Sequence, residues 1–206
     1  SRFSHSLDAF HYNYTNAAGN RDMIKIEINY SLRTHVFQAE ERCLLTDAFG
    51  EPISVNTVAV AEIFAAKANA LMSRAAARDL YDFCNMVDQN TISGKEDLFR
   101  KCTVFYATIS EKEVNRTFDT VAIDKLSFSR IRTDLFPVLG VNKKFALEEK
   151  KLQAKEFIAA VMMLQDGEKE YMDRFISKEY RPELLFGDYE IVERIKNHPM
   201  ALWKCR

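Results

Sequence analysis

Glycine and proline are scarce in this chain, with 6 glycines and 4 prolines among 206 residues. This scarcity excludes collagen-like, low-complexity and mostly disordered proteins. Long hydrophobic runs are also missing, since no stretch reaches the roughly 18 apolar residues of a membrane-spanning helix. Residues 1–5 do not begin the apolar core of a signal peptide. We therefore expect a globular protein that does not enter a membrane and that works in the cytoplasm.

An excess of charge of one sign is absent as well. The 29 Lys and Arg residues nearly balance the 30 Asp and Glu residues, for a formal net charge of −1. The protein therefore has no overall positive field to hold nucleic acid, and any such contact needs a local basic patch. None of the four cysteines forms a C-x-x-C pair, so we expect reduced thiols and no zinc site.

Strand signals are confined to the first 60 residues. Phe10–Tyr14 and Ile24–Tyr30 each alternate apolar and polar side chains and are separated by turn-forming residues. The pattern predicts an antiparallel hairpin in which Ile26 and Ile28 face the core and Glu27 faces a cleft. Weaker strand signals occupy residues 31–37 and 53–60.

From residue 61 onward the apolar spacing is helical. We expect Phe99, Phe105, Phe157 and Leu164 to be buried among these helices. The chain thus divides into a small sheet region and a helical region. The predicted helices occupy residues 61–74, 78–88, 95–109, 142–164, 167–178 and 188–197.

Charged residues interrupt the apolar faces of the first two predicted helices. Lys67 lies within the apolar face of the first helix, and Asp79 lies within that of the second, with Asp82 at its margin. Arg78 can reach Asp82 at i,i+4. A buried charge without a partner costs several kcal/mol. Lys67 and Asp79 therefore either form a structural salt bridge, or Lys67 extends to solvent, or both line a wet functional pocket.

Four segments, matching in order, resemble the AbiEii/AbiGii toxin family of nucleotidyltransferases. The most specific are E-I-F-A-A-K at residues 62–67 and R-D-L-Y-D at residues 78–82. K-I-E-I-N-Y-S-L-R at residues 25–33 and N-H-P-M-A-L-W-K at residues 197–204 are similar to family members as well. The resemblance spans nearly the whole chain.

This resemblance implies an α+β fold, with a small mixed sheet of nucleotidyltransferase type flanked by helices and followed by a helical bundle domain. The implied domains are residues 1–92 and residues 93–206. It implies transfer of a nucleotide from an NTP to an acceptor, tRNA for some relatives. Many members are toxins of toxin–antitoxin or abortive-infection systems, so a cognate antitoxin is an implied partner.

The resemblance also implies roles for the charged residues. Lys67 matches the family lysine, implied to contact the nucleotide, and Asp79 and Asp82 match a later acidic motif. Glu27 takes the place of the family's third metal-binding acid, for Mg²⁺. Arg78 either touches phosphate or orients Asp82. Carboxylates that hold Mg²⁺ and a cation that offsets developing charge are what nucleotidyl transfer requires.

The family's Gly-Gly-Ser/Thr turn and Asp-x-Asp pair are not found in this sequence. One interpretation is that the chain begins downstream of that metal-binding motif. The other aligns residues 2–8 with it, so that Asp8 is a metal ligand and Ser6 replaces the first aspartate, which makes the site degenerate. A catalytically inactive relative that binds nucleotide, RNA or a protein partner is the alternative function.

The helix predicted over residues 142–164 is rich in lysine. These lysines form either an acceptor-binding surface or a solvated face: Lys143, Lys144, Lys150, Lys151 and Lys155.

Overall fold

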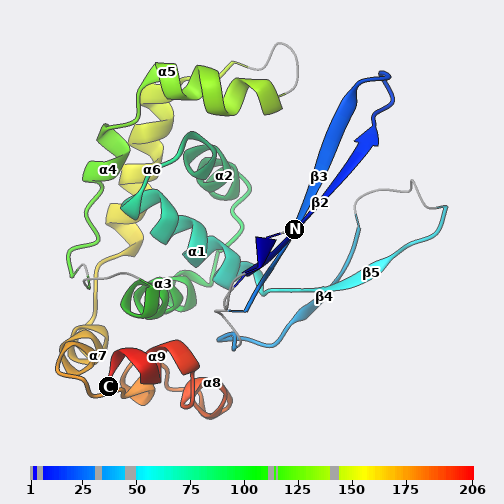
Figure 1. Ribbon diagram of the computed structural model, residues 1–206. Helices are drawn as coiled ribbons and strands as arrows, with labels where there is room; N and C mark the ends of the chain where they lie inside the picture. Colours follow the sequence, from blue (N-terminus) through cyan, green and yellow to red (C-terminus); the bar gives the residue numbers. More distant parts are fainter. Residues whose placement is uncertain are drawn as a thin grey trace.

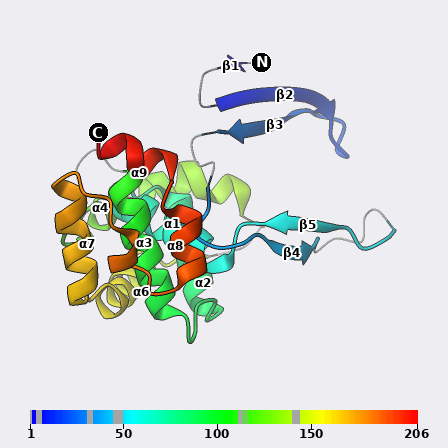
Figure 2. The same ribbon diagram turned by 90° about the horizontal axis from the view of Figure 1, so that it is seen from below.

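The computed structural model describes residues 2–3, 7–30, 34–44, 50–110, 114, 116–139 and 144–206. It consists of a helical body from which two β-hairpins extend on one side (Figures 1 and 2). None of the helices within these segments is long and apolar enough to cross a membrane. Ser6, Lys143 and residues 31–33 lie outside the described residues.

The described strands form two small sheets. One sheet has the order β1-β2-β3 and the other pairs β4 with β5. Every pairing among these strands is antiparallel, so the prediction of a mixed sheet is wrong for the described part of the chain. The reason is that β2–β3 and β4–β5 are successive strands joined as hairpins, and such a connection can only produce antiparallel neighbours. The strands are β1 (Arg2–Phe3), β2 (Leu7–Thr15), β3 (Arg21–Asn29), β4 (Glu40–Cys43) and β5 (Ser54–Thr57).

The β2–β3 hairpin confirms the predicted pairing, with Phe10 opposite Ile26 and Tyr12 opposite Ile24. Its predicted burial is wrong. Ile26 is 47% exposed and Ile28 is 43% exposed, because no described helix covers this face of the hairpin. The expectation that helices flank the sheet fails here for the same reason.

The helices begin and end close to their predicted positions. The long segment predicted over residues 142–164 is shorter, since its helix begins at Leu147 and ends at Val161. Helical turns also occupy residues 121–138, where no helix was expected. The helices are α1 (Val60–Ser73), α2 (Ala77–Asp88), α3 (Glu96–Ser110), α4 (Val121–Asp124), α5 (Phe128–Arg130), η1 (Ile131–Leu135), η2 (Phe136–Val138), α6 (Leu147–Val161), α7 (Asp166–Ile176), η3 (Pro182–Leu184), α8 (Tyr189–Ile195) and α9 (Pro199–Lys204).

An aromatic cluster holds the helical body together. Phe64 of α1 contacts Phe83, Phe99 and Phe157, with ring centroids 4.9, 4.9 and 5.8 Å away. Phe99 and Phe105 are fully buried as predicted, whereas Phe157 and Leu164 are partly buried. Because Phe64 and Phe99 belong to one core, residues on both sides of the predicted boundary at residues 92 and 93 pack together. No strand follows β5 in the described residues, so the later part of the chain is helical there.

Candidate nucleotide-binding site

Four of the six predicted site residues lie on α1 and α2, which are joined by a turn of residues 74–76: Lys67, Arg78, Asp79 and Asp82. The buried face of α1 is formed by small and apolar side chains, including Phe64, Ala68 and Leu71. Lys67 lies at the margin of this face rather than within it. The turn is tight, and Ala75 adopts the left-handed region with φ +46°. One ion pair joins α2 to α1 across the seam between them, and a second joins α2 to the turn.

The first ion pair is formed by Lys67 and Asp82. The Lys67 Nζ donates to Asp82 Oδ2 at 2.6 Å, and the two side chains are 36% and 41% exposed. The predicted Lys67–Asp79 salt bridge is therefore wrong, because the crossing of the helices brings Asp82 to the lysine instead. Since both groups remain open to solvent, an anionic ligand can reach the ammonium without unfolding the seam.

The second ion pair holds Asp79, whose side chain is 5% exposed. Arg74 donates from Nε and Nη2 to the two carboxylate oxygens at 2.8 and 3.1 Å. This hydrogen bonding to Asp79 raises the pKa of Arg74 above its usual range. Asp79 is thus a buried carboxylate, as its position on the apolar face predicted, with a bidentate arginine partner. Its geometry suits a structural tie between α1 and α2.

Arg78 does not pair with Asp82, which takes Lys67 as its partner. The Arg78 Nε donates instead to the carbonyl oxygen of Asp134 in η1 at 3.0 Å. Arg78 therefore connects the start of α2 to the helical turns after residue 120.

The two predicted metal ligands on the hairpin lie apart. Glu27 is opposite Ala9 and Asp8 is opposite Ile28, and successive residues of a strand point to opposite faces. Glu27 and Asp8 therefore cannot bind the same ion in this register. Glu27 forms an ion pair with Lys25 at 2.7 Å. Asp8 accepts a hydrogen bond from the Tyr30 hydroxyl at 3.1 Å.

The described residues do not fit a Mg²⁺ site. Within these segments no three His, Cys, Asp or Glu side chains converge as a set of ligands. Glu27 supplies a single carboxylate with a lysine against it, and no second acid stands beside it on that face of the hairpin. We therefore derive no chemical step through a metal ion.

Glu62 begins the E-I-F-A-A-K segment, and its burial was not predicted from the sequence. Its carboxylate is buried and accepts the backbone N–H groups of Val36 and Phe37 at 2.9 and 3.2 Å. It also accepts the Tyr106 hydroxyl and contacts His35 Nδ1 at 3.1 Å. Burial and the Glu62 charge together raise the pKa of Tyr106 far above its usual range. A charge among the alanines at the start of α1 was the signal that could have found it.

His198, at the start of α9, ties the end of the chain to the same region. Its Nε2 lies 3.1 Å from the carbonyl oxygen of Thr34, and since a carbonyl only accepts, Nε2 carries the proton. The buried Nδ1 has no partner among the described residues. Burial lowers the pKa of His198 below its ordinary 6.5, because removal from water disfavours the charged imidazolium.

The lysines of α6 are mostly neutralised. Lys150 pairs with Asp88 at 2.8 Å and Lys155 pairs with Asp124 at 2.9 Å. Lys151 pairs with Glu148 at 3.0 Å. These contacts favour the solvated face over the acceptor-binding surface.

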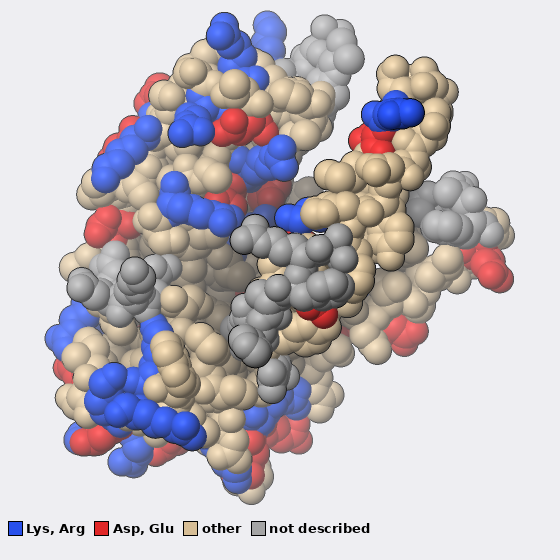
Figure 3. All heavy atoms as spheres, in the orientation of Figure 1, with Lys and Arg blue, Asp and Glu red and all other residues tan. Residues whose placement is uncertain are grey.

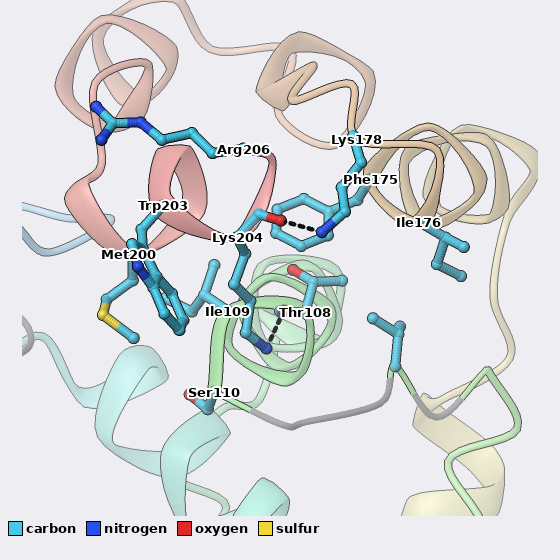
Figure 4. Close-up of a pocket in the computed structure, with 11 residues that line it drawn as sticks. Thr108, Ile109, Ser110, Phe175, Ile176, Lys178, Met200, Trp203, Lys204 and Arg206 are labelled. Atoms are coloured by element: carbon cyan, nitrogen blue, oxygen red, sulfur yellow. Dashed lines mark hydrogen bonds between the residues drawn. The ribbon is translucent and has the colours of Figure 1, made fainter.

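A large cavity lies elsewhere, between α3, α7 and α9 (Figure 4). Its volume is about 750 Å³, and its lining includes Phe175, Met200 and Trp203. Lys204 reaches across it to the carbonyl oxygen of Thr108 at 3.0 Å. None of the predicted site residues lines this cavity, so it is separate from the α1–α2 seam.

An α+β protein with a solvent-open lysine–carboxylate pair suits a ligand that carries phosphate, because a flexible ammonium is a common phosphate contact. Residues 5–179 match the family of nucleotidyl transferase AbiEii toxins of type IV toxin–antitoxin systems. The chain belongs to this family, and the match includes Lys67, Asp79 and Asp82. No curated protein and no solved structure matches the chain.

Proposed function

We propose that this protein transfers a nucleotide from an NTP to an RNA acceptor, with tRNA as the acceptor class, and that Lys67 binds the triphosphate. The observation that carries the proposal is the open Lys67–Asp82 pair on the seam of a chain from the nucleotidyltransferase family. The acceptor hydroxyl attacks the α-phosphorus, a new phosphodiester bond forms, and pyrophosphate leaves with the electrons of the broken anhydride bond. The hydroxyl proton is released to solvent.

Each charged residue has a distinct part in this proposal. The Lys67 ammonium offsets the negative charge that grows on the phosphates during transfer. Asp82 orients that ammonium from 2.6 Å. Asp79 and Arg74 hold the helices in place and do not contact the nucleotide. Glu27 has no part in the transfer step, because it pairs with Lys25 and no set of metal ligands converges among the described residues. Arg78 is a proposed phosphate contact through the guanidinium nitrogens that have no partner in the described part of the chain.

A transfer assay tests the proposal. The protein is incubated with each labelled NTP in turn, Mg²⁺ and total RNA, and label in the RNA is measured. Wild-type protein should label RNA, and Lys67→Ala should abolish labelling while remaining folded. Lys155→Ala is the matched control, since its side chain is 37% exposed and it also pairs with an aspartate. Undiminished transfer by a folded Lys67→Ala protein contradicts the role of this lysine.

The second candidate function is a catalytically inactive relative that binds nucleotide, RNA or a protein partner. It rests on the alignment of residues 2–8 with the family's metal-binding motif, in which Ser6 stands in the place of the first aspartate. Wild-type protein that binds NTP without labelling any RNA would support this alternative.

The toxin role is tested in cells. We propose that the protein acts in the cytoplasm and that a cognate antitoxin counteracts it, as membership of a type IV toxin–antitoxin family suggests. Induced expression of wild-type protein should arrest growth, and Lys67→Ala should not. Equal arrest by both proteins would separate toxicity from nucleotide transfer.

A further inference from the structure

A polar pocket opens at the other end of the α1–α2 seam. Its volume is about 390 Å³. The turn of residues 73–77 forms one wall, and α4, α5 and η1 form the other. Its charged lining residues are Arg74, Lys125, Arg130 and Asp134.

Positive charge exceeds negative charge around this pocket. Lys125 has no ion-pair or hydrogen-bond partner for its ammonium among the described residues. Arg130 has only a loose pair, with 3.7 Å between its Nη1 and Asp134 Oδ2, and its side chain is 72% exposed. Arg78 lies beside the pocket, and within the described segments its guanidinium donates only from Nε, to the Asp134 carbonyl oxygen.

Nearby carboxylates do not cancel these cations. Asp79 is buried against Arg74, and Asp124 is engaged by Lys155 at 2.9 Å. Asp134 is the one acidic residue that lines the pocket within the described chain. The protein as a whole has a net charge of −1, so this positive surplus is local. Lys and Arg side chains gather over this upper-left part of the molecule in Figure 3, where Figure 1 shows α4, α5 and α6.

The pocket and Lys67 are aligned along one helix. Arg74, which caps the C-terminal end of α1 just after Ser73, follows Lys67 by seven positions, or nearly two helical turns. At a rise of ~1.5 Å per residue they are separated by about 10 Å along the helix axis. A polyanion that occupies the pocket can therefore continue along the seam toward Lys67.

We infer that this pocket binds backbone phosphates of the RNA acceptor through Lys125 and Arg130, with Arg78 beside them. This inference rests on the proposed function, because it takes the acceptor to be RNA. Binding to phosphate does not require these two exposed cations to break a firm ion pair, since neither has one among the described residues. The α6 lysines, in contrast, would first have to release their carboxylates.

The test compares RNA binding by wild-type protein, Lys125→Ala/Arg130→Ala and the control Lys169→Ala. Lys169 is also an exposed lysine, on α7, paired loosely with Asp166 at 3.3 Å. The probe is a labelled RNA hairpin with a single-stranded 3′ end, titrated by fluorescence anisotropy at several salt concentrations. Because the changed side chains are exposed, thermal melts should confirm that all three proteins are folded.

The double variant should bind RNA about tenfold more weakly at low salt, with a log Kd–log salt slope that is smaller by about 1.5, since each lost phosphate contact removes ~0.7–0.9. Its affinity for NTP should not change. Lys169→Ala should match wild type in both slope and affinity. An unchanged slope in the double variant overturns the inference, and so does weaker NTP binding with intact RNA binding.

The two proposals fail in different ways. Lys67→Ala should still bind the RNA hairpin, because Lys67 does not line the pocket. Wild-type protein that labels a non-RNA acceptor and does not bind the hairpin would overturn this inference and leave nucleotide transfer standing. RNA binding that depends on Lys125 and Arg130, by a protein that transfers no nucleotide, would overturn the proposed transfer and leave the RNA-binding pocket standing.

Discussion

Replacing Lys67 by alanine should cost little stability, although the residue lies on a helix that packs into the core. Lys67 and Asp82 are 36% and 41% exposed, and exposed ion pairs contribute ~0.2–1 kcal/mol. Asp82, left alone, can be hydrated where it stands. We expect the free energy of unfolding to fall by about 0.5 kcal/mol, which lowers Tm by about 1–2 °C in a protein of this size.

Arg74→Ala is the informative comparison, because it removes the partner of a buried carboxylate. Asp79 is 5% exposed, and breaking a fully buried pair costs ~3–5 kcal/mol. Arg74 itself is 69% exposed, so water can replace part of the guanidinium, and we expect about 2 kcal/mol and a Tm lowered by about 4–8 °C. Circular dichroism melts of both variants measure the difference. If Lys67→Ala melts as low as Arg74→Ala, the Lys67 pair is structural and our reading of an open site is wrong.

Further predictions concern Glu62, His198 and the β2–β3 hairpin. Glu62→Ala leaves the Val36 and Phe37 N–H groups and the Tyr106 hydroxyl without their acceptor, so urea unfolding should show a loss of about 3 kcal/mol or more; a loss below about 1 kcal/mol would contradict this tie. The lowered pKa of His198 means that the unfolded chain binds a proton first, so stability should fall as pH drops below its ordinary 6.5. Urea midpoints measured against pH should fall less steeply for His198→Gln, and equal slopes would exclude His198 as the cause. Ile26→Ser should change stability by less than about 1 kcal/mol, because the side chain is half-exposed, and should reduce any self-association seen by analytical ultracentrifugation; a loss of about 2–3 kcal/mol would show that this face is covered.

Periodicity predicted which residues share a face but not whether that face is covered. The alternation in β2 and β3 correctly predicted an antiparallel hairpin of these two segments. It placed Ile26 in the core, where the structure leaves it 47% exposed. Burial depends on a second element, and nothing in the strand itself specifies one. The helical periodicity of α1 succeeded for Phe64 and Leu71, which are fully buried, because α3 and α6 supply the missing surfaces.

The site shows the same limit for charges. A charge on an apolar helical face predicted that Asp79 either is paired or lines a wet pocket, and the structure shows it buried and paired. Its partner could not be predicted, because the crossing of α1 and α2 decides that Arg74 reaches Asp79 and that Lys67 reaches Asp82. Glu62 depends still more on distant chain, since its backbone donors lie 26 and 25 residues earlier. The sequence therefore identifies the charged residues on each helix, whereas the tertiary structure determines which residues they pair with.

That distinction also decides which charged residues are available to a ligand. Asp79, Glu62 and the α6 lysines are all engaged by partners that the fold brings to them. Among the described residues Lys125 and Arg130 have no firm partner, and the Lys67–Asp82 pair stays open to solvent. Availability therefore follows from the packing of helices and not from the number of charges in a segment. For this reason we propose the sparse cations at the α1–α2 seam, rather than the lysine-rich helix α6, as the surface on which nucleotide and acceptor meet.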